Sequence, residues 1–228
     1  MSVLEATHNF LALFSLLTLM LLDIHTHRQA PYPEGIISVE PSPFSPVEGQ
    51  TYSAGVHPWH LGATPEEVEE QCRRLAEIAS LECIRAIGEA GFDTLRGAPM
   101  MLQSLAFRRQ VDLSEQLKKP LVIHCVKTLD MIRAWRRESG ASQPWIVHGF
   151  RGKPQAARQL LAAGCFISFG EKFNEETLRC MPAEACFAET DESPLPIEDI
   201  IALHSLVRGE DMKPVIEKNM QRLFPTFG

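Results

Sequence analysis

The sequence carries little positive charge. It has 22 Lys and Arg residues against 29 Asp and Glu residues, which gives a net charge of -7. A protein that grips a long nucleic acid normally presents a broad basic surface, so the composition argues against that mode of binding. It does not exclude a nucleic-acid substrate, because bound metal ions can supply positive charge at a small site.

Closely paired cysteines are also missing. The six cysteines form no CxxC pair and are spread over 228 residues, so neither a zinc ribbon nor a small disulfide scaffold is indicated. Reduced thiols in a cytoplasmic protein are the better interpretation. We expect no obligate protein partner, because no segment suggests one.

The first residues lack the features of a targeting signal. An apolar run covers residues 10–22, but no Lys or Arg precedes it and no small-residue cleavage site follows it. It is also short for a membrane span, and we expect no membrane association. We therefore treat residues 1–19 as an apolar extension, or as the product of a start assigned too early with Met20 as the true start. Residues 20–228 are then one domain.

Short apolar runs and helical stretches alternate along most of the chain. Hydrophobic residues make up 45% of the sequence, enough for a sizeable core. Continuous apolar runs are typical of parallel strands buried on both faces. The eight expected strands are Met20–Ile24, Ile36–Glu40, Tyr52–Val56, Cys83–Gly88, Leu121–His124, Trp145–His148, Cys165–Phe169 and Ala185–Glu189.

Helices are expected after the later strands. The first should begin at Thr64, which precedes a proline and two glutamates as an N-cap residue does, and end near Leu81. The others are expected at Pro99–Lys118, Leu129–Glu138, Pro154–Ala163, Glu175–Met181, Ile197–Leu206 and Met212–Leu223. Residues 28–35 and 41–50 are too short for a helix. The pattern predicts an α/β fold, a TIM-like (β/α) barrel that lacks its first two outer helices.

Metal-binding side chains stand where these strands end. His25 and His27 are two residues apart, so both side chains point to the same face of the first strand. Four more candidate ligands, Glu89, His124, His148 and Asp191, each follow a later strand. The carboxyl ends of barrel strands meet at one rim, so we expect these six residues to lie together. Such a mixture of ligands suits Zn, Mn, Co or Fe and leaves Mg possible.

Seven motifs, in this order and spacing, resemble the TatD-related deoxyribonuclease family of metal-dependent hydrolases. They are LLDIHTH, GVHPW, IGEAGFD, VIHC, VHGFRG, ISFG and ETDESP, and the resemblance covers residues 20–224. It implies a TIM-like barrel and phosphodiester hydrolysis, often of DNA ends. It also implies two divalent cations, one bound by His25, His27, Glu89 and Asp191, and the other by Glu89, His124 and His148.

The resemblance also assigns roles. Glu89 is then a catalytic residue shared by both cations, and Asp191 orients or deprotonates the attacking water. The chain departs from the family around the substrate: the segment between the first and third strands is shortened, and Trp59, Thr94 and Lys127 replace the usual His, Tyr and Arg. This sequence therefore resembles a short variant of the family.

Three residues are candidates for substrate binding. His57 ends the third strand, and Lys127 and Arg151 lie just past ligand-bearing strands, where they could meet a phosphate. For each, a turn or solvated-surface role is the alternative. Trp59 could stack on a base or simply pack.

The most favoured function is a metal-dependent phosphodiesterase or deoxyribonuclease that acts on nucleic acid ends or small phosphodiesters through water activated by two metals. An amidohydrolase acting on a C–N bond is the alternative, although such barrels often bridge their metals with a Lys where this chain has Glu89. A binding protein without activity would be expected to lose a ligand, and none is lost.

Overall fold

Eight parallel strands form a closed barrel in the computed structural model, which describes residues 21–225. The strands pair in sequence order, and β8 closes the barrel on β1. This confirms the expected TIM-like fold. The strands are β1 Asp23–Thr26, β2 Gly35–Val39, β3 Thr51–Ala54, β4 Ile84–Asp93, β5 Leu121–Val126, β6 Trp145–Val147, β7 Cys165–Phe169 and β8 Cys186–Ala188.

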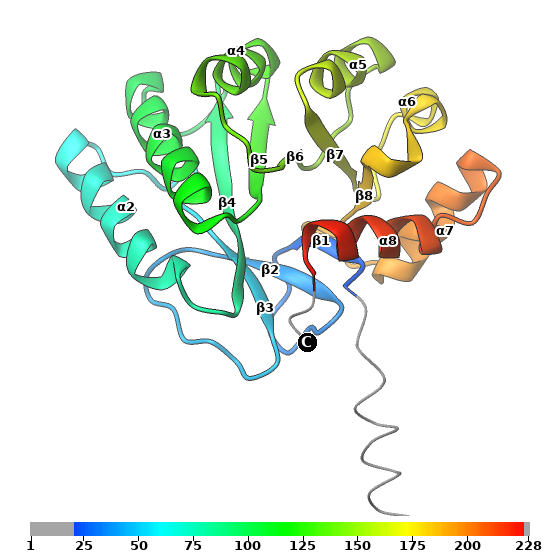
Figure 1. Ribbon diagram of the computed structural model, residues 1–228, viewed down its shortest axis with the longest axis horizontal. Coiled ribbons are helices and arrows are strands. Elements are labelled where there is room, and N and C mark those ends of the chain that lie inside the picture. The colour runs from blue at the N-terminus through cyan, green and yellow to red at the C-terminus, as the bar shows by residue number, and fades with distance from the viewer. Residues whose placement is uncertain (1–20, 226–228) are drawn as a thin grey trace, which may run out of the picture.

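Helices follow each strand from β3 onward and surround the barrel (Figure 1). Thr64 caps the first of them: its side chain accepts a hydrogen bond from the Glu67 amide, and the Glu67 carboxylate accepts one from the Thr64 amide. The helices are α2 Pro65–Ala79, α3 Met100–Leu117, α4 Leu129–Ser139, α5 Pro154–Ala162, α6 Glu175–Cys180, α7 Ile197–Arg208 and α8 Lys213–Leu223, with a short 3-10 helix at Ala183–Ala185.

The first two connections contain no helix within the described residues. β1 joins β2, and β2 joins β3, through loops alone, as expected from their lengths. The proposed extension at residues 1–19 lies outside the described residues. Among residues 21–225, no helix combines the length and the apolar character that a membrane crossing requires.

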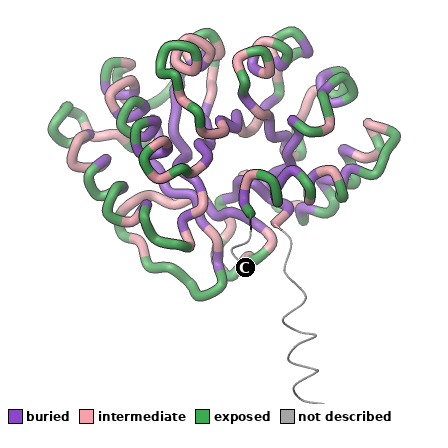
Figure 2. The backbone as a smooth tube through the Cα atoms, in the orientation of Figure 1, coloured by how far each residue is buried: buried purple, intermediate pink, exposed green. Residues whose placement is uncertain are grey.

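The core fills the barrel and the space beneath the helices. Figure 2 shows buried strands inside and exposed outer faces on the helices. Phe92, Phe107 and Trp145 are fully buried, and the Phe107 ring of α3 contacts Phe92 of β4 at a tilt and Trp145 of β6 edge-on. These contacts fix α3 against β4 and β6.

Two strand boundaries near the site differ from the sequence prediction. β1 is Asp23–Thr26 and includes His25, whereas Met20–Ile24 was expected. β4 continues to Asp93, so Glu89 lies within a strand and does not follow one as expected. The strand continues because residues 90–93 pair with residues 123–126 of β5.

Glycines on both sides of Glu89 permit this pairing. Gly88 and Gly91 have φ values of 128° and 151°, which side chains rarely tolerate. A Cβ at Gly91 would lie 2.0 Å from the His124 carbonyl oxygen, and one at Gly88 would lie 2.4 Å from that of Val122. β4 and β5 can therefore approach closely only with glycine at these two positions.

Candidate metal centre

The six expected ligands converge at one end of the barrel. β1 and the segment after β8 are held together by two backbone hydrogen bonds: His27 donates to the Asp191 carbonyl at 3.1 Å, and Asp191 donates to that of His25 at 3.0 Å. Asp191 has a φ of 53°, a left-handed conformation that Asp adopts more readily than most residues. This bend places its carboxylate 3.7 Å from His27 Nε2 and 3.9 Å from His25 Nε2.

Glu89 is at the centre of the cluster, and its two oxygens face different histidines. Oε2 lies 3.3 Å from His25 Nε2 and 3.6 Å from His27 Nε2. Oε1 lies 2.6 Å from His124 Nδ1 and 2.7 Å from His148 Nε2. The carboxylate thus separates two sets of nitrogen donors and belongs to both.

His57 lies against the same carboxylate but is oriented as a hydrogen-bond donor. Its Nδ1 accepts a hydrogen bond from the Trp59 amide at 3.1 Å. In the neutral ring the proton is then on Nε2, which donates to Glu89 Oε1 at 3.0 Å. The lone pair that a metal would need is already used, so His57 supports the orientation of Glu89.

Two further carboxylates stand behind the histidines. Asp93 Oδ2 lies 3.4 Å from His124 Nε2 and accepts a 2.7 Å hydrogen bond from the Trp59 indole. The fully buried Glu189 accepts from the Gly149 amide at 2.6 Å and lies 3.7 Å from His148 Nδ1. Carboxylates in this position commonly orient histidines that ligate metals.

Burial and mutual charge shift the protonation of the cluster. Burial by itself would raise the pKa of Glu89, but His148, His124 and His25 hold it well below its usual range. Burial opposes charge on His148, yet Glu89 and Glu189 raise its pKa well above the usual value. Burial, and then His148, lower the pKa of His25. The pKa values of the two neighbouring rings, His148 and His25, are therefore shifted in opposite directions.

The donor set fits divalent cations. Four groups of three donors lie within 4.8 Å of one another, including His25, His27 and Asp191 together and His25, Glu89 and His148 together. Both ring nitrogens of His25 and one oxygen of Glu189 are buried without a hydrogen bond in the described chain. Buried polar atoms normally have a partner, and imidazole with carboxylate is a common ligand set for such ions.

The centre opens into a cavity of about 610 Å³. His57 and Arg151, two of the candidate substrate residues, line it together with His27 and Asp191, whereas the exposed Lys127 is not among the described residues that do. Arg96 also lines it, and its guanidinium carbon lies 3.9 Å from the centre of the Trp59 ring. One face of Trp59 is therefore covered by Arg96, which does not favour the base-stacking role considered for it. Nothing in the sequence pointed to Arg96.

The fold and the centre together define a class of protein: a parallel barrel that carries metal-binding side chains at the carboxyl ends of its strands. Residues 47–225 match the model of the TatD related DNase family, and the chain belongs to this family. The resemblance seen in the motifs is thereby confirmed.

Individual relatives agree with this assignment. The chain is 34% identical over 155 residues to a Pantoea protein named 3'-5' ssDNA/RNA exonuclease TatD, and the match spans 61% of this chain and 56% of that one. It is 31% identical over 160 residues to an uncharacterized metal-dependent hydrolase of Buchnera aphidicola, with 65% and 59% covered. The matches thus span less than two thirds of these relatives' length.

Solved structures show the same fold. The Escherichia coli TatD homolog YJJV superposes with a TM-score of 0.75 at 18% identity, covering 91% of this chain and 98% of that one. A TatD family hydrolase from Entamoeba histolytica gives a TM-score of 0.71 at 16% identity, with 91% and 99% covered.

Proposed function

We propose that this chain is a metal-dependent hydrolase that cleaves phosphodiester bonds at the ends of short or single-stranded nucleic acids, or in small phosphodiesters. The position of Glu89 carries the proposal, because its two oxygens face two separate sets of histidines. A carboxylate so placed suits a bridge between two cations. The exonuclease name of the Pantoea relative supports nucleic acid as the substrate class.

His25, His27, Glu89 and Asp191 would hold one divalent cation, and Glu89, His124 and His148 the other. Bound cations of this kind lower the pKa of water and neutralise the charge that develops on a phosphoryl group. Mg, Mn, Zn and Co are all compatible with these ligands.

The protein's own groups have distinct tasks in this scheme. Asp191 is 28% exposed toward the cavity and would take the proton of the attacking water. His57 keeps Glu89 in place through its 3.0 Å hydrogen bond. Arg151 and Arg96 reach the cavity wall and would bind substrate phosphate, and Lys127 would act farther out on the same rim.

The test compares metal-dependent rates on a short single strand, a closed circular duplex and a small chromogenic phosphodiester. We expect turnover of the first and third and little nicking of the circle. Asp191→Asn should lower the rate by about 10²- to 10⁴-fold with native circular dichroism, because an amide is a poor base. Asp112→Asn, at an exposed position on α3, is the matched control.

Two results would contradict the proposal. Fast nicking of the circle without action on the other substrates would exclude the preference for ends. Inactivity on all three, together with hydrolysis of a cyclic amide, would favour an amidohydrolase.

A further inference from the structure

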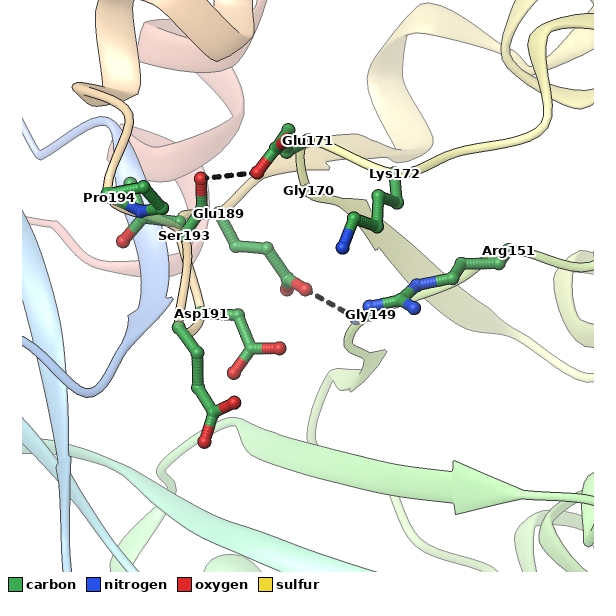
Figure 3. Close-up of a pocket in the computed structure, with 11 residues that line it drawn as sticks. Gly149, Arg151, Gly170, Glu171, Lys172, Glu189, Asp191, Ser193 and Pro194 are labelled. Carbon is green, nitrogen blue, oxygen red and sulfur yellow. Dashed lines mark hydrogen bonds between the residues drawn. The ribbon is translucent and has the colours of Figure 1, made fainter.

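A second cavity, of about 230 Å³, adjoins the metal centre. It lies between the segments that follow β6, β7 and β8 and shares Asp191, Glu192 and Arg151 with the first cavity. Figure 3 shows Arg151 and Lys172 entering from the side opposite Asp191. Two positively charged side chains, Arg151 and Lys172, thus face Asp191, which would activate water. The space between them is large enough for a phosphate group.

The charged groups of Arg151 and Lys172 form no polar contact of their own with the described protein. Within residues 21–225, no hydrogen bond or ion pair involves the Arg151 guanidinium or the Lys172 amine. By contrast, Arg28 donates to two backbone carbonyls, and Arg179 pairs with Glu175. Free cations in a cavity of an acidic protein are well suited to an anion from outside.

The acidic neighbour of Lys172 has a partner of its own. Glu171 accepts a 2.7 Å hydrogen bond from the Ser193 hydroxyl, and Figure 3 shows it turned toward Ser193. Glu171 therefore forms no ion pair with Lys172, and its hydrogen bond links the loop after β7 to the segment after β8.

An apolar surface continues from these cations. A third hollow, of about 540 Å³, shares Arg151, Glu171 and Lys172 with the second cavity and is lined beyond them by Phe173, Leu203 and Leu206. Leu206 is 81% exposed and Leu203 40%. Six large apolar side chains are exposed in the described chain, and two of them lie here. Arg151 lines all three hollows, so they adjoin one another along a path that leads away from the metal centre.

We propose that this path is a subsite for the nucleotide next to the scissile phosphodiester. Arg151 and Lys172 bind its phosphate, and Phe173, Leu203 and Leu206 contact its base. Cations suit phosphate oxygens, and an apolar wall suits the face of an unpaired base of any sequence. A paired base would present no free face, so the subsite selects single strands. The inference rests on the proposed function, since it orders a substrate of that class.

The experiment compares two substrates, bis(4-nitrophenyl) phosphate with one phosphate and thymidine tetranucleotide with several. In Lys172→Ala, we expect the ratio of kcat/KM for the tetranucleotide to that for the small ester to fall by about tenfold, the size of one lost charge-assisted hydrogen bond. The dependence of log KM on log salt should weaken by roughly 0.7, as for one lost contact to a single strand. Lys172→Arg should restore both values.

Two matched controls separate the subsite from general effects. Lys218→Ala removes an exposed lysine of α8 that lines none of the three hollows, and should change neither quantity. Leu206→Gln should reduce the ratio about threefold through lost apolar contact. Met101→Gln changes an apolar side chain of α3 that is 69% exposed, and it should leave the ratio unchanged.

Binding is measured separately from turnover. A fluorescent phosphorothioate tetranucleotide that resists hydrolysis is titrated with the metal-loaded protein, and Lys172→Ala should weaken the affinity by about the same tenfold. An unchanged affinity and ratio in Lys172→Ala would overturn the subsite while leaving the proposed function intact. An inactive native protein that nevertheless binds the analogue through Lys172 would overturn the hydrolase and retain the subsite.

Discussion

The barrel has two parts built in different ways. Residues 23–54, the loop-connected part, contain three strands joined without helices, whereas residues 84–223, the helix-connected part, place a helix after every strand. Both parts supply candidate ligands at the same rim: His25 and His27 come from the first, and Glu89, His124, His148 and Asp191 from the second. The comparison shows that strand pairing alone is enough to position a ligand, and that helices mainly add buried core.

Glu89→Ala tests whether the histidines of the loop-connected part and those of the helix-connected part share one carboxylate. Because both sets of histidines face Glu89, we expect metal content to fall at both sites and turnover to drop by on the order of 10³-fold or more. Elemental analysis with native circular dichroism is the measurement, and Glu176→Ala on α6 is the control. Normal metal content would disprove the shared carboxylate, and retention of one ion would show that one set of ligands binds a cation without Glu89.

Paired core truncations compare the stability of the two parts. Phe107 is fully buried against Phe92, Trp135 and Trp145, so Phe107→Ala should cost about 3–5 kcal/mol. Phe44, in the loop before β3, is partly exposed and contacts Tyr52 edge-on, so Phe44→Ala should cost about 1 kcal/mol. Urea denaturation measures both. Equal costs would mean that the loops pack as tightly as the helices.

His204 makes the helix-connected part sensitive to acid. Burial lowers its pKa to about 4, although its hydrogen bond to the Gly170 carbonyl partly opposes this. The unfolded chain therefore takes up this proton first, so stability is unaffected above about pH 6.5 and falls as the pH drops toward 4, by about 2 kcal/mol at pH 5. Denaturation between pH 7 and 5 should show this loss, and His204→Gln should remove that component. If stability still falls with pH in His204→Gln as it does in the native protein, His204 is excluded as the cause of the acid sensitivity.

Arg96→Ala should have the smallest effect. Arg96 lies on Trp59 at the cavity wall, next to the loop-connected part, and its removal should raise the KM for a short single strand about three- to fivefold. Arg108 offers a close match, since it also lies over a tryptophan, Trp135, but lines none of the described hollows near the centre. Equal effects of Arg96→Ala and Arg108→Ala would assign Arg96 a structural role only.

The sequence predicted the convergence of the candidate ligands better than their surroundings. Apolar runs located all eight strands, and a side chain at the end of a strand in a parallel barrel can point only to one rim, so the places of His124 and His148 at that rim were predictable from position alone. The end of β4 was misplaced because Gly88 looks like a strand terminator, whereas here it allows close pairing. Arg96 and Lys172 were missed because loop residues follow no period, and only the folded loops bring them to the cavities.

The glycines around Glu89 bear on how tolerant this chain is to mutation. Gly88 and Gly91 bind nothing, yet any side chain at Gly91 would collide with the backbone of His124. In a saturation mutagenesis experiment, both positions should therefore score as intolerant as the ligands themselves. A library built to broaden the substrate range should leave β4 unchanged from residue 88 to 91 and vary the loop after β7, where the backbone carries no such constraint from a neighbouring strand.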